Sequence, residues 1–396
     1  MSAQQRRIQE QMLKMGYQPV RKSQFQLKPI SIVKQIHTLP DIPITQRLEV
    51  THQGASKLQK VISTFRASND NIRITCKRTS IQRMSIKEII KNYVKYQNSL
   101  QLDGLDALRN LIKNGDSINI NINKAQNIEF FIGTLSDGHG EFGSQISSLI
   151  TEYYIDELQK LFNSIPLLQI SLTLKDSLNK IYQQIEQNLI AQTLIDYRLS
   201  GASLLSVIIV NNVIYCSNLG DSKAAYFYKS EQLNDNPKEI RKFIQKNLNQ
   251  IHDTNSGKEV DRIMRRGGKI DQAIFKGQKE GSLKIWVPKQ NYPGIKITRC
   301  FGNSIGKTIG ITADHDFLEF KIPKSGYLLM ASTGLWEKLD ILLIEQILDN
   351  YYPPQSWADL DKATKQLGNE TKKFWDVDGQ GSVDISLSLV YISLEK

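Results

Sequence analysis

The residues that most clearly suggest chemistry are Asp137, Gly138 and His139, which follow an apolar, β-branched run at 128–135. An Asp that ends a buried strand and precedes a Gly places a carboxylate beside an accessible backbone carbonyl at the rim of a sheet. Both groups are hard oxygen ligands of the kind that Mg²⁺ and Mn²⁺ prefer. His139 is a candidate proton donor to a leaving alkoxide. An ordinary Asp-Gly turn explains the same short motif, so these residues alone do not establish a site.

Two further acids stand at the ends of strand-like runs. Asp384 opens the apolar run 384–394 behind a Gly-rich loop, and we expect it to approach Asp137 in space. Gly220 and Asp221 close a hairpin strand. We interpret Asp221 as part of a structural turn, because Asp side chains readily accept local backbone hydrogen bonds.

The elements that must position these residues follow from hydrophobic periodicity. Apolar spacing predicts amphipathic helices over 144–162 and 172–195. Buried or half-buried strands are predicted at 128–135, 203–210, 213–219, 327–332 and 384–394, with a hairpin at Asn211-Asn212. The mixture predicts the α+β class, with antiparallel sheets built from hairpins and flanked by paired helices.

Seven segments, taken in order, resemble motifs of the type 2C (PPM) metal-dependent Ser/Thr protein phosphatases. They lie at 54–59, 136–140, 200–227, 259–268, 297–303, 328–339 and 381–392. The resemblance runs from about Gly54 to the C-terminus and rests on the order of several weak motifs. It implies a four-layer fold, in which a central antiparallel β-sandwich carries helical pairs on its outer faces.

The resemblance also implies a set of metal ligands. In the family, two metal ions between the sheets activate the water that attacks phosphorus. Asp137 takes the place of the bridging carboxylate and Gly138 that of the carbonyl ligand. Asp384 takes the last-strand position, although an alternative alignment puts Val383 there.

Several family positions are not acidic in this chain. Thr333 and Asn303 stand where the family has acids, and the second acid of the Thr333 motif is Glu337. By an ungapped count, the Arg and Glu-Asp pair of the family's opening strand fall on Ile62, Arg66 and Ala67. With about two carboxylates remaining, a binuclear site is disfavoured, because two divalent ions repel each other unless anions offset their charge. We therefore expect no cofactor or a single, weakly bound Mg²⁺ or Mn²⁺.

Charge and composition suggest the partner. The chain of 396 residues has a formal net charge of +11, and through residue 50 it has eight Lys and Arg against three Asp and Glu. We predict a basic arm at 1–48 and a phosphatase-like domain at 49–396, with a polar surface insertion at about 230–256. The arm residues expected to bind an acidic partner are Arg6, Arg7, Arg21, Lys22, Lys28 and Lys34.

These observations favour a non-catalytic, pseudophosphatase-like protein that acts as a scaffold on an acidic partner or large assembly, for which tubulin in a microtubule is one candidate. An active Mn²⁺- or Mg²⁺-dependent Ser/Thr phosphatase with an altered site is the alternative, and a regulator that binds phosphorylated partners without cleaving them is a third. The three cysteines form no C-x-x-C pair, and no apolar run is long enough for a signal peptide or membrane span. We expect a cytoplasmic protein, with a cytoskeletal or ciliary location as an option. Nucleic-acid binding is disfavoured by the lack of a recognition motif.

Overall fold

The computed structural model describes residues 72–73, 94–104, 114–125, 128–165, 169–191, 194–229, 243–275, 277–378 and 383–394. All of them belong to a single compact unit at 70–396. The predicted arm at 1–48, the residues at 54–67 and the stretch 230–242 lie outside the described residues. In the described part, no helix is long and apolar enough to cross a bilayer.

Six strands form the first sheet. They are ordered β1 (Ile72–Arg73), β2 (Val94–Leu102), β17 (Ile385–Ile392), β16 (Gly326–Ala331), β9 (Lys223–Lys229) and β10 (Phe243–Asn247). All neighbouring pairs are antiparallel. The strand β10 lies within the segment 230–256, so the described part of that segment includes an edge strand of the sheet.

Five strands form the second sheet. They are ordered β15 (Asp316–Lys321), β8 (Val213–Leu219), β7 (Leu204–Val210), β4 (Ile128–Ser136) and β3 (Ser117–Ala125), again with antiparallel pairing. Alternate residues of the two sheets meet in an apolar core that includes Phe131, Leu205, Cys216, Tyr226, Leu328 and Val390. Since side chains alternate between the faces of a strand, the other residues of each strand face outward toward helices.

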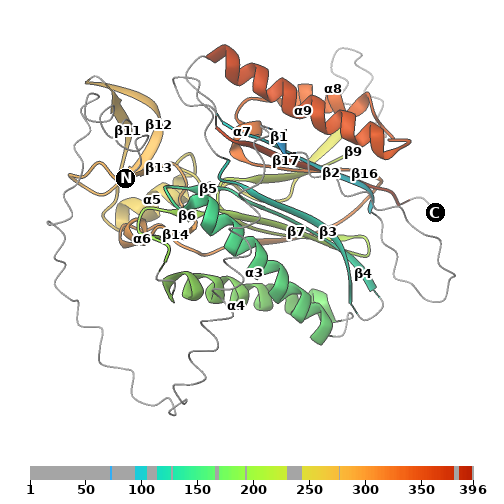
Figure 1. Cartoon of the computed structure of the whole chain (residues 1–396), viewed down its shortest axis with the longest axis horizontal. Coiled ribbons are helices and arrows are strands. Elements are labelled where there is room, and N and C mark those ends of the chain that lie inside the picture. Colours follow the sequence, from blue (N-terminus) through green and yellow to red (C-terminus); the bar gives the residue numbers. More distant parts are fainter. Residues whose placement is uncertain are drawn as a thin grey trace, which may run out of the picture. The chain divides into compact units, whose positions relative to one another are not determined.

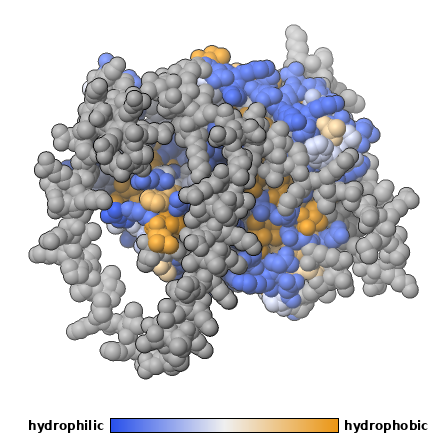
Figure 2. All heavy atoms as spheres, in the orientation of Figure 1, coloured by the Kyte–Doolittle hydropathy of each residue, from blue (hydrophilic) through white to orange (hydrophobic). Residues whose placement is uncertain are grey.

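Helices cover both outer faces of the sandwich. The long helices α3 (Gly143–Ser164) and α4 (Ile170–Ala191) pack on the second sheet through residues such as Ile146, Phe162 and Leu178. The helices α7 (Thr333–Trp336), α8 (Ile341–Asp349) and α9 (Trp357–Asp378) pack on the first sheet through Leu335, Ile347 and Leu367. Figure 1 shows the resulting order of helices, sheet, sheet and helices. The outward surface over α8 and α9 is mostly hydrophilic (Figure 2). The predicted α+β class and four-layer fold are therefore confirmed.

Two smaller assemblies adjoin the sandwich. One consists of α5 (Gly257–Arg265), β11 (Lys269–Phe275), β12 (Gln278–Trp286), β13 (Pro293–Ile295) and α6 (Ser304–Thr308), around a small apolar core that includes Ile263, Ile285 and Ile311. The other is a short ladder of β14 (Phe301–Gly302), β6 (Gly201–Ala202) and β5 (Gly138–His139). This ladder fixes the backbone of Gly138 and His139, because Gly138 pairs with Ala202 and His139 pairs with Gly201.

Candidate metal centre

Strand register brings Asp116 and Asp137 together. Ser117 of β3 pairs with Ser136 of β4, so Asp116 and Asp137 occupy the next position, just beyond the paired strands. The backbone of Asp137 is held on its other side, since its N–H donates to Ser203 Oγ at 2.9 Å and its carbonyl accepts from Ser203 N–H at 2.9 Å. The two carboxyl groups therefore meet at the same rim of the second sheet.

Asp384 reaches this rim from the first sheet. It directly precedes β17, and its carboxylate accepts hydrogen bonds from the backbone N–H groups of Gly104 at 2.8 Å and Gly115 at 2.7 Å. Gly115 is the residue before Asp116, so the bond draws Asp384 toward the Asp116–Asp137 pair. The two bonds favour the approach of Asp384 to Asp137, which stays a prediction. Val383, the alternative ligand position, has an apolar side chain that is 45% exposed.

Asp221 completes a cluster of four carboxyl groups, which we call the acid cluster: Asp116, Asp137, Asp221 and Asp384. Burial, followed by the charges of its acidic neighbours, raises the pKa of Asp116 to about 7. Burial and the charges of Asp116 and Asp221 hold the pKa of Asp137 well above its usual range. Burial also raises the pKa values of Asp221 and Asp384. Burial and mutual repulsion thus disfavour the ionised forms of these carboxyl groups when no cation is bound.

This cluster has the chemistry of a divalent-cation site. Both carboxylate oxygens of Asp116 are buried and have no hydrogen-bond partner, which is costly unless a ligand satisfies them. Within the described residues, however, no three His, Cys, Asp or Glu side chains are grouped tightly enough to form a metal site as they stand. An ion at this cluster would therefore have few direct carboxylate ligands and would keep several waters, as Mg²⁺ commonly does. The residues fit such a partly hydrated divalent ion.

Gly138 also belongs to this site. A Cβ on Gly138 would lie 2.3 Å from the Gly143 carbonyl oxygen and 2.7 Å from that of Gly115. A Cβ on Gly115 would in turn lie 2.7 Å from the Gly138 carbonyl oxygen and 3.8 Å from Asp384 Oδ2. The Gly138 carbonyl, which we predicted as a metal ligand, thus lies beside the acid cluster. Only glycine permits this packing of backbone on backbone.

His139 lies next to the cluster but in a restricted chemical state. Its Nε2 lies 3.1 Å from Asn303 Nδ2, and Asn303 Oδ1 accepts from the Gly306 N–H at 3.0 Å. Since Oδ1 is the acceptor for Gly306, Nδ2 must donate to the imidazole, and the proton of the neutral ring sits on Nδ1. Burial lowers the pKa of His139 to about 4, so the ring is neutral at pH 7. The predicted role as proton donor is therefore restricted to Nδ1.

Thr333, at a lost acid position, and Glu337, the second acid of the same motif, both make other interactions. Thr333 begins α7, and its hydroxyl lies 3.4 Å from the Asp221 carbonyl oxygen, to which it donates. The carboxylate of Glu337 pairs with Lys296 Nζ at 2.5 Å, and the same ammonium lies 3.6 Å from Asp253. Glu337 is therefore neutralised by a lysine instead of being free to bind a metal ion.

The sequence prediction missed Asp116 and undervalued Asp221. The ungapped count places the Glu-Asp pair of the opening strand at Arg66 and Ala67, which lie outside the described residues. The alternation of Ile and Asn at 118–123 is the signal for β3, and pairing it with 128–136 would have placed Asp116 opposite Asp137. Asp221 lies in a turn, as expected. Its negative charge also raises the pKa values of Asp116 and Asp137.

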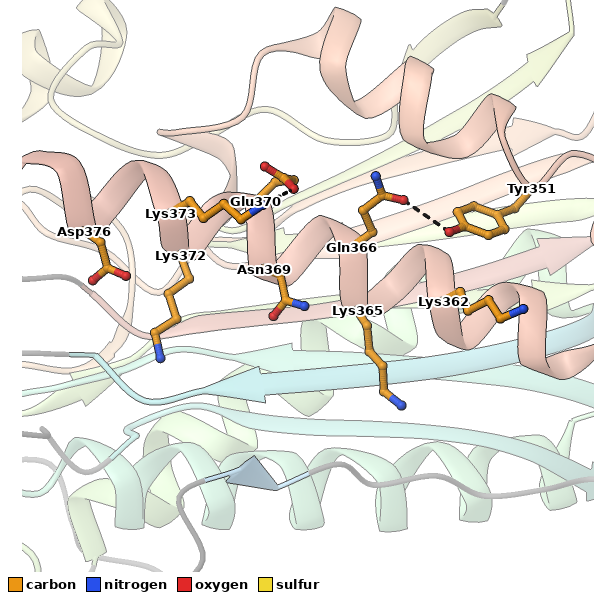
Figure 3. A pocket seen from close by; sticks show the side chains of 9 residues that line it. All are labelled: Tyr351, Lys362, Lys365, Gln366, Asn369, Glu370, Lys372, Lys373 and Asp376. Carbon is orange, nitrogen blue, oxygen red and sulfur yellow. Dashed lines mark hydrogen bonds and ion pairs between the residues drawn. The ribbon is translucent and has the colours of Figure 1, made fainter.

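A separate cavity lies along α9 and contains none of the four acids. Its volume is about 530 Å³, and it is lined by Tyr351, Lys362, Lys365, Gln366, Asn369, Glu370, Lys372, Lys373 and Asp376. Figure 3 shows Lys365, Asn369 and Lys372 projecting from one side of the helix, whereas Gln366 is directed toward Tyr351. Lys365 pairs with Asp361 and Lys373 with Glu370, so much of the lysine charge is already balanced.

Comparison with known proteins identifies the family. The family model for protein phosphatase 2C matches residues 109–372, which is more than half of the chain. The chain therefore belongs to the protein phosphatase 2C family, as the ordered motifs predicted.

Individual relatives are distant. The probable protein phosphatase 2C 35 of Arabidopsis thaliana is 23% identical over 288 residues, which cover 67% of this chain and 74% of the relative. The probable protein phosphatase 2C 75 of Oryza sativa subsp. japonica is 26% identical over 203 residues, which cover 51% of this chain and only 44% of the relative.

Two solved structures share the fold. The serine-threonine phosphatase 2C from Toxoplasma gondii superposes with a TM-score of 0.57 at 13% identity, over 76% of this chain and 96% of that one. A C. elegans sex determining protein gives a TM-score of 0.56 at 15% identity, over 76% of this chain and 65% of that one. At such identities the likeness establishes the architecture alone.

Proposed function

We propose that this chain is a divalent-metal-dependent phosphatase that hydrolyses phosphoserine and phosphothreonine in proteins. The observation that carries the proposal is the convergence of Asp116, Asp137, Asp221 and Asp384 from four separate places in the sequence. The sequence alone had suggested about two carboxylates, and four make a cation site at the rim of the sandwich more favourable. Membership of the protein phosphatase 2C family supports the same reaction.

The residues have distinct tasks in this proposal. Divalent ions supply, when bound, a Lewis acid and an activated water for in-line attack on phosphorus. The acid cluster and the Gly138 carbonyl would bind the divalent cation. The hydrogen bonds from the Gly104 and Gly115 N–H groups orient the Asp384 carboxylate. His139 Nδ1–H is the group that remains able to donate a proton or hydrogen bond at neutral pH.

The test is turnover of a phosphothreonine peptide by the full chain at saturating Mn²⁺ or Mg²⁺. We expect cation-dependent release of phosphate, and its loss in the separate variants Asp137→Asn and Asp384→Asn. The matched control is Asp261→Asn, because Asp261 is an α5 acid whose side chain is 66% exposed and lies 3.9 Å from Arg265 of the same helix. Equal turnover in the control and the two site variants would contradict the proposal.

A second candidate function is a non-catalytic phosphatase-fold protein that docks on an acidic partner. It is favoured by the neutral residues Thr333 and Asn303 at acid positions and by the Lys296–Glu337 ion pair. The net charge of +11 favours an acidic surface such as that of tubulin, in a cytoplasmic, microtubule-based or ciliary setting.

Co-sedimentation with microtubules tests the second candidate. The full chain should sediment with them in low salt, and a chain without residues 1–48 should not. Microtubule binding that persists after the deletion would contradict a role for the basic arm. Robust Mn²⁺-dependent turnover would contradict the proposal that the protein is non-catalytic.

A further inference from the structure

His252 makes two hydrogen bonds to Gly220, the residue that precedes Asp221 in its turn. The Gly220 N–H donates to His252 Nδ1 at 3.1 Å, and the His252 backbone N–H donates to the Gly220 carbonyl at 2.9 Å. The Asn218 side chain adds a second donor to that carbonyl at 2.9 Å. His252 is 2% exposed, so these bonds are shielded from water.

The second ring nitrogen of His252 fixes the state of the first. Its Nε2 lies 2.9 Å from Asp316 Oδ2, and Asp316 Oδ1 accepts from Arg299 Nη1 at 3.0 Å. An amide N–H can only donate, so His252 Nδ1 must present its lone pair to Gly220. The ring proton therefore sits on Nε2 and is donated to Asp316. One tautomer satisfies both partners.

The geometry of the turn gives Gly220 little freedom to move. Its φ angle is +131°, which favours glycine, and a Cβ there would lie 2.4 Å from Ser203 Cβ. Ser203 is also the residue that holds the backbone of Asp137. A shift of Gly220 would therefore change the position of Asp221 relative to Asp137.

We propose that His252 is a positioning residue of the metal centre, which acts through the Gly220 amide to place the Asp221 carboxyl group in the acid cluster. This inference rests on the proposed metal site. It gives the hydrogen bonds that join Asp316, His252 and Gly220 a task beyond folding, because Gly220 directly precedes Asp221 of the acid cluster.

Two substitutions test the hydrogen bonds of the two imidazole nitrogens one at a time. In His252→Asn, the amide oxygen takes the place of Nδ1 and accepts from Gly220, but the side chain is too short to reach Asp316. In His252→Gln, the amide reaches toward Asp316 and leaves the Gly220 N–H without its acceptor. Replacing partners that orient metal ligands commonly costs about 10–100-fold in metal affinity.

The measurement is Mn²⁺ affinity of the full chain by calorimetry, with the melting temperature of the metal-free protein recorded separately. We expect His252→Asn to stay within about threefold of the unmodified affinity and His252→Gln to lose about tenfold or more. His315→Gln is the matched control, since His315 lies beside Asp316 and contacts its backbone carbonyl instead of Gly220. This control should bind Mn²⁺ normally.

The outcomes are distinguishable. If the unmodified chain binds no Mn²⁺, the proposed metal centre fails and this inference fails with it. If it binds Mn²⁺ and both His252 variants bind equally well or equally poorly, only the positioning role is overturned. Should a variant not fold, the scalar coupling between Gly220 N and His252 Nδ1 in the unmodified, isotope-labelled chain decides. Its presence supports the inference, and its absence overturns it.

Discussion

Asp116 and Asp137 stand opposite each other across β3 and β4, one position beyond the Ser117–Ser136 pair. Like charges directly opposite on a strand pair are destabilising, and here burial adds to the cost. Both carboxyl groups therefore retain protons at pH values where free Asp has lost them. This single relationship leads to two predictions about pH and metal ions.

The first prediction concerns the metal-free protein. The pKa of Asp116 is about 7 in the folded chain, whereas an unfolded Asp has a value near 3.8. Between these values the folded state binds more protons, so the free energy of unfolding must fall as pH rises. In EDTA, we expect the melting temperature to drop by roughly 5 °C between pH 5 and pH 8. Asp116→Asn should reduce this drop, and a melting temperature that rises with pH over this range would contradict the account.

The second prediction concerns added cations. Protons and divalent ions compete for the same carboxylates, so Mn²⁺ should bind more tightly at pH 8 than at pH 5.5. Because ligands stabilise the state that they bind, the rise in melting temperature on adding Mn²⁺ should be larger at pH 8. Thermal unfolding at both pH values checks this, with Asp137→Asn as the variant that should show little shift. An equal shift at the two pH values would be the contrary result.

The third prediction concerns the imidazole of His139. Asn303 donates to its Nε2, whereas the carboxylate of an Asp at that place would accept a hydrogen bond from a protonated Nε2 and favour the charged ring. We expect Asn303→Asp to raise the pKa of His139 from about 4 by at least one unit. Asp tolerates the left-handed backbone at this position, where φ is 49°. Histidine NMR titration measures the effect, and an unchanged pKa would show that burial alone sets it.

The fourth prediction restores an acid at Thr333. A carboxylate there would add negative charge beside Asp221, and each added charged ligand strengthens cation binding. We expect Thr333→Asp to tighten Mn²⁺ binding about tenfold, which is about 1.4 kcal/mol. Thr308→Asp, on the exposed side of α6, is the control and should leave the affinity unchanged. Weaker binding in Thr333→Asp would place residue 333 outside the cation site.

The fifth prediction concerns stability away from the acid cluster. Glu259 is 4% exposed and pairs with Arg299 at 2.6 Å and Arg262 at 2.7 Å. Burial would raise the pKa of Glu259, but the hydrogen bonds from Arg299 and Thr298 outweigh it and lower the pKa to about 2. The stability from this group is therefore present above pH 4.5 and is lost as pH falls toward 2.

Replacing Glu259 leaves its cationic partners without their anion. We expect Glu259→Gln to lower the free energy of unfolding at pH 7 by about 3 kcal/mol, as measured by urea denaturation. The exposed Glu280 on β12 offers the control Glu280→Gln, which should change stability by less than about 0.5 kcal/mol. If Glu259→Gln changed the free energy of unfolding as little as Glu280→Gln does, the Glu259 ion pairs would contribute little to stability.

Local patterns predicted the fold well because helices and hairpins are encoded over short stretches. The helix expected at 144–162 is found as α3, and the strands around Asn211-Asn212 are found as β7 and β8. The site was harder to predict, since its parts meet through long-range pairing. Nothing near Asp384 in the sequence reveals that Gly104 and Gly115 donate to it. The bond between Asn303 and His139 likewise joins residues far apart in the chain.

The position of β17 has a consequence for biosynthesis. Of the described strands it is translated last, yet it lies between β2 and β16, with ladder partners on both sides. Until residues 385–392 are in place, β2 and β16 each lack a ladder partner on the side that β17 occupies. Open edges of this kind invite pairing with other chains. Completion of the first sheet should therefore wait for this strand, which joins β2 to β16 and brings Asp384 to the acid cluster.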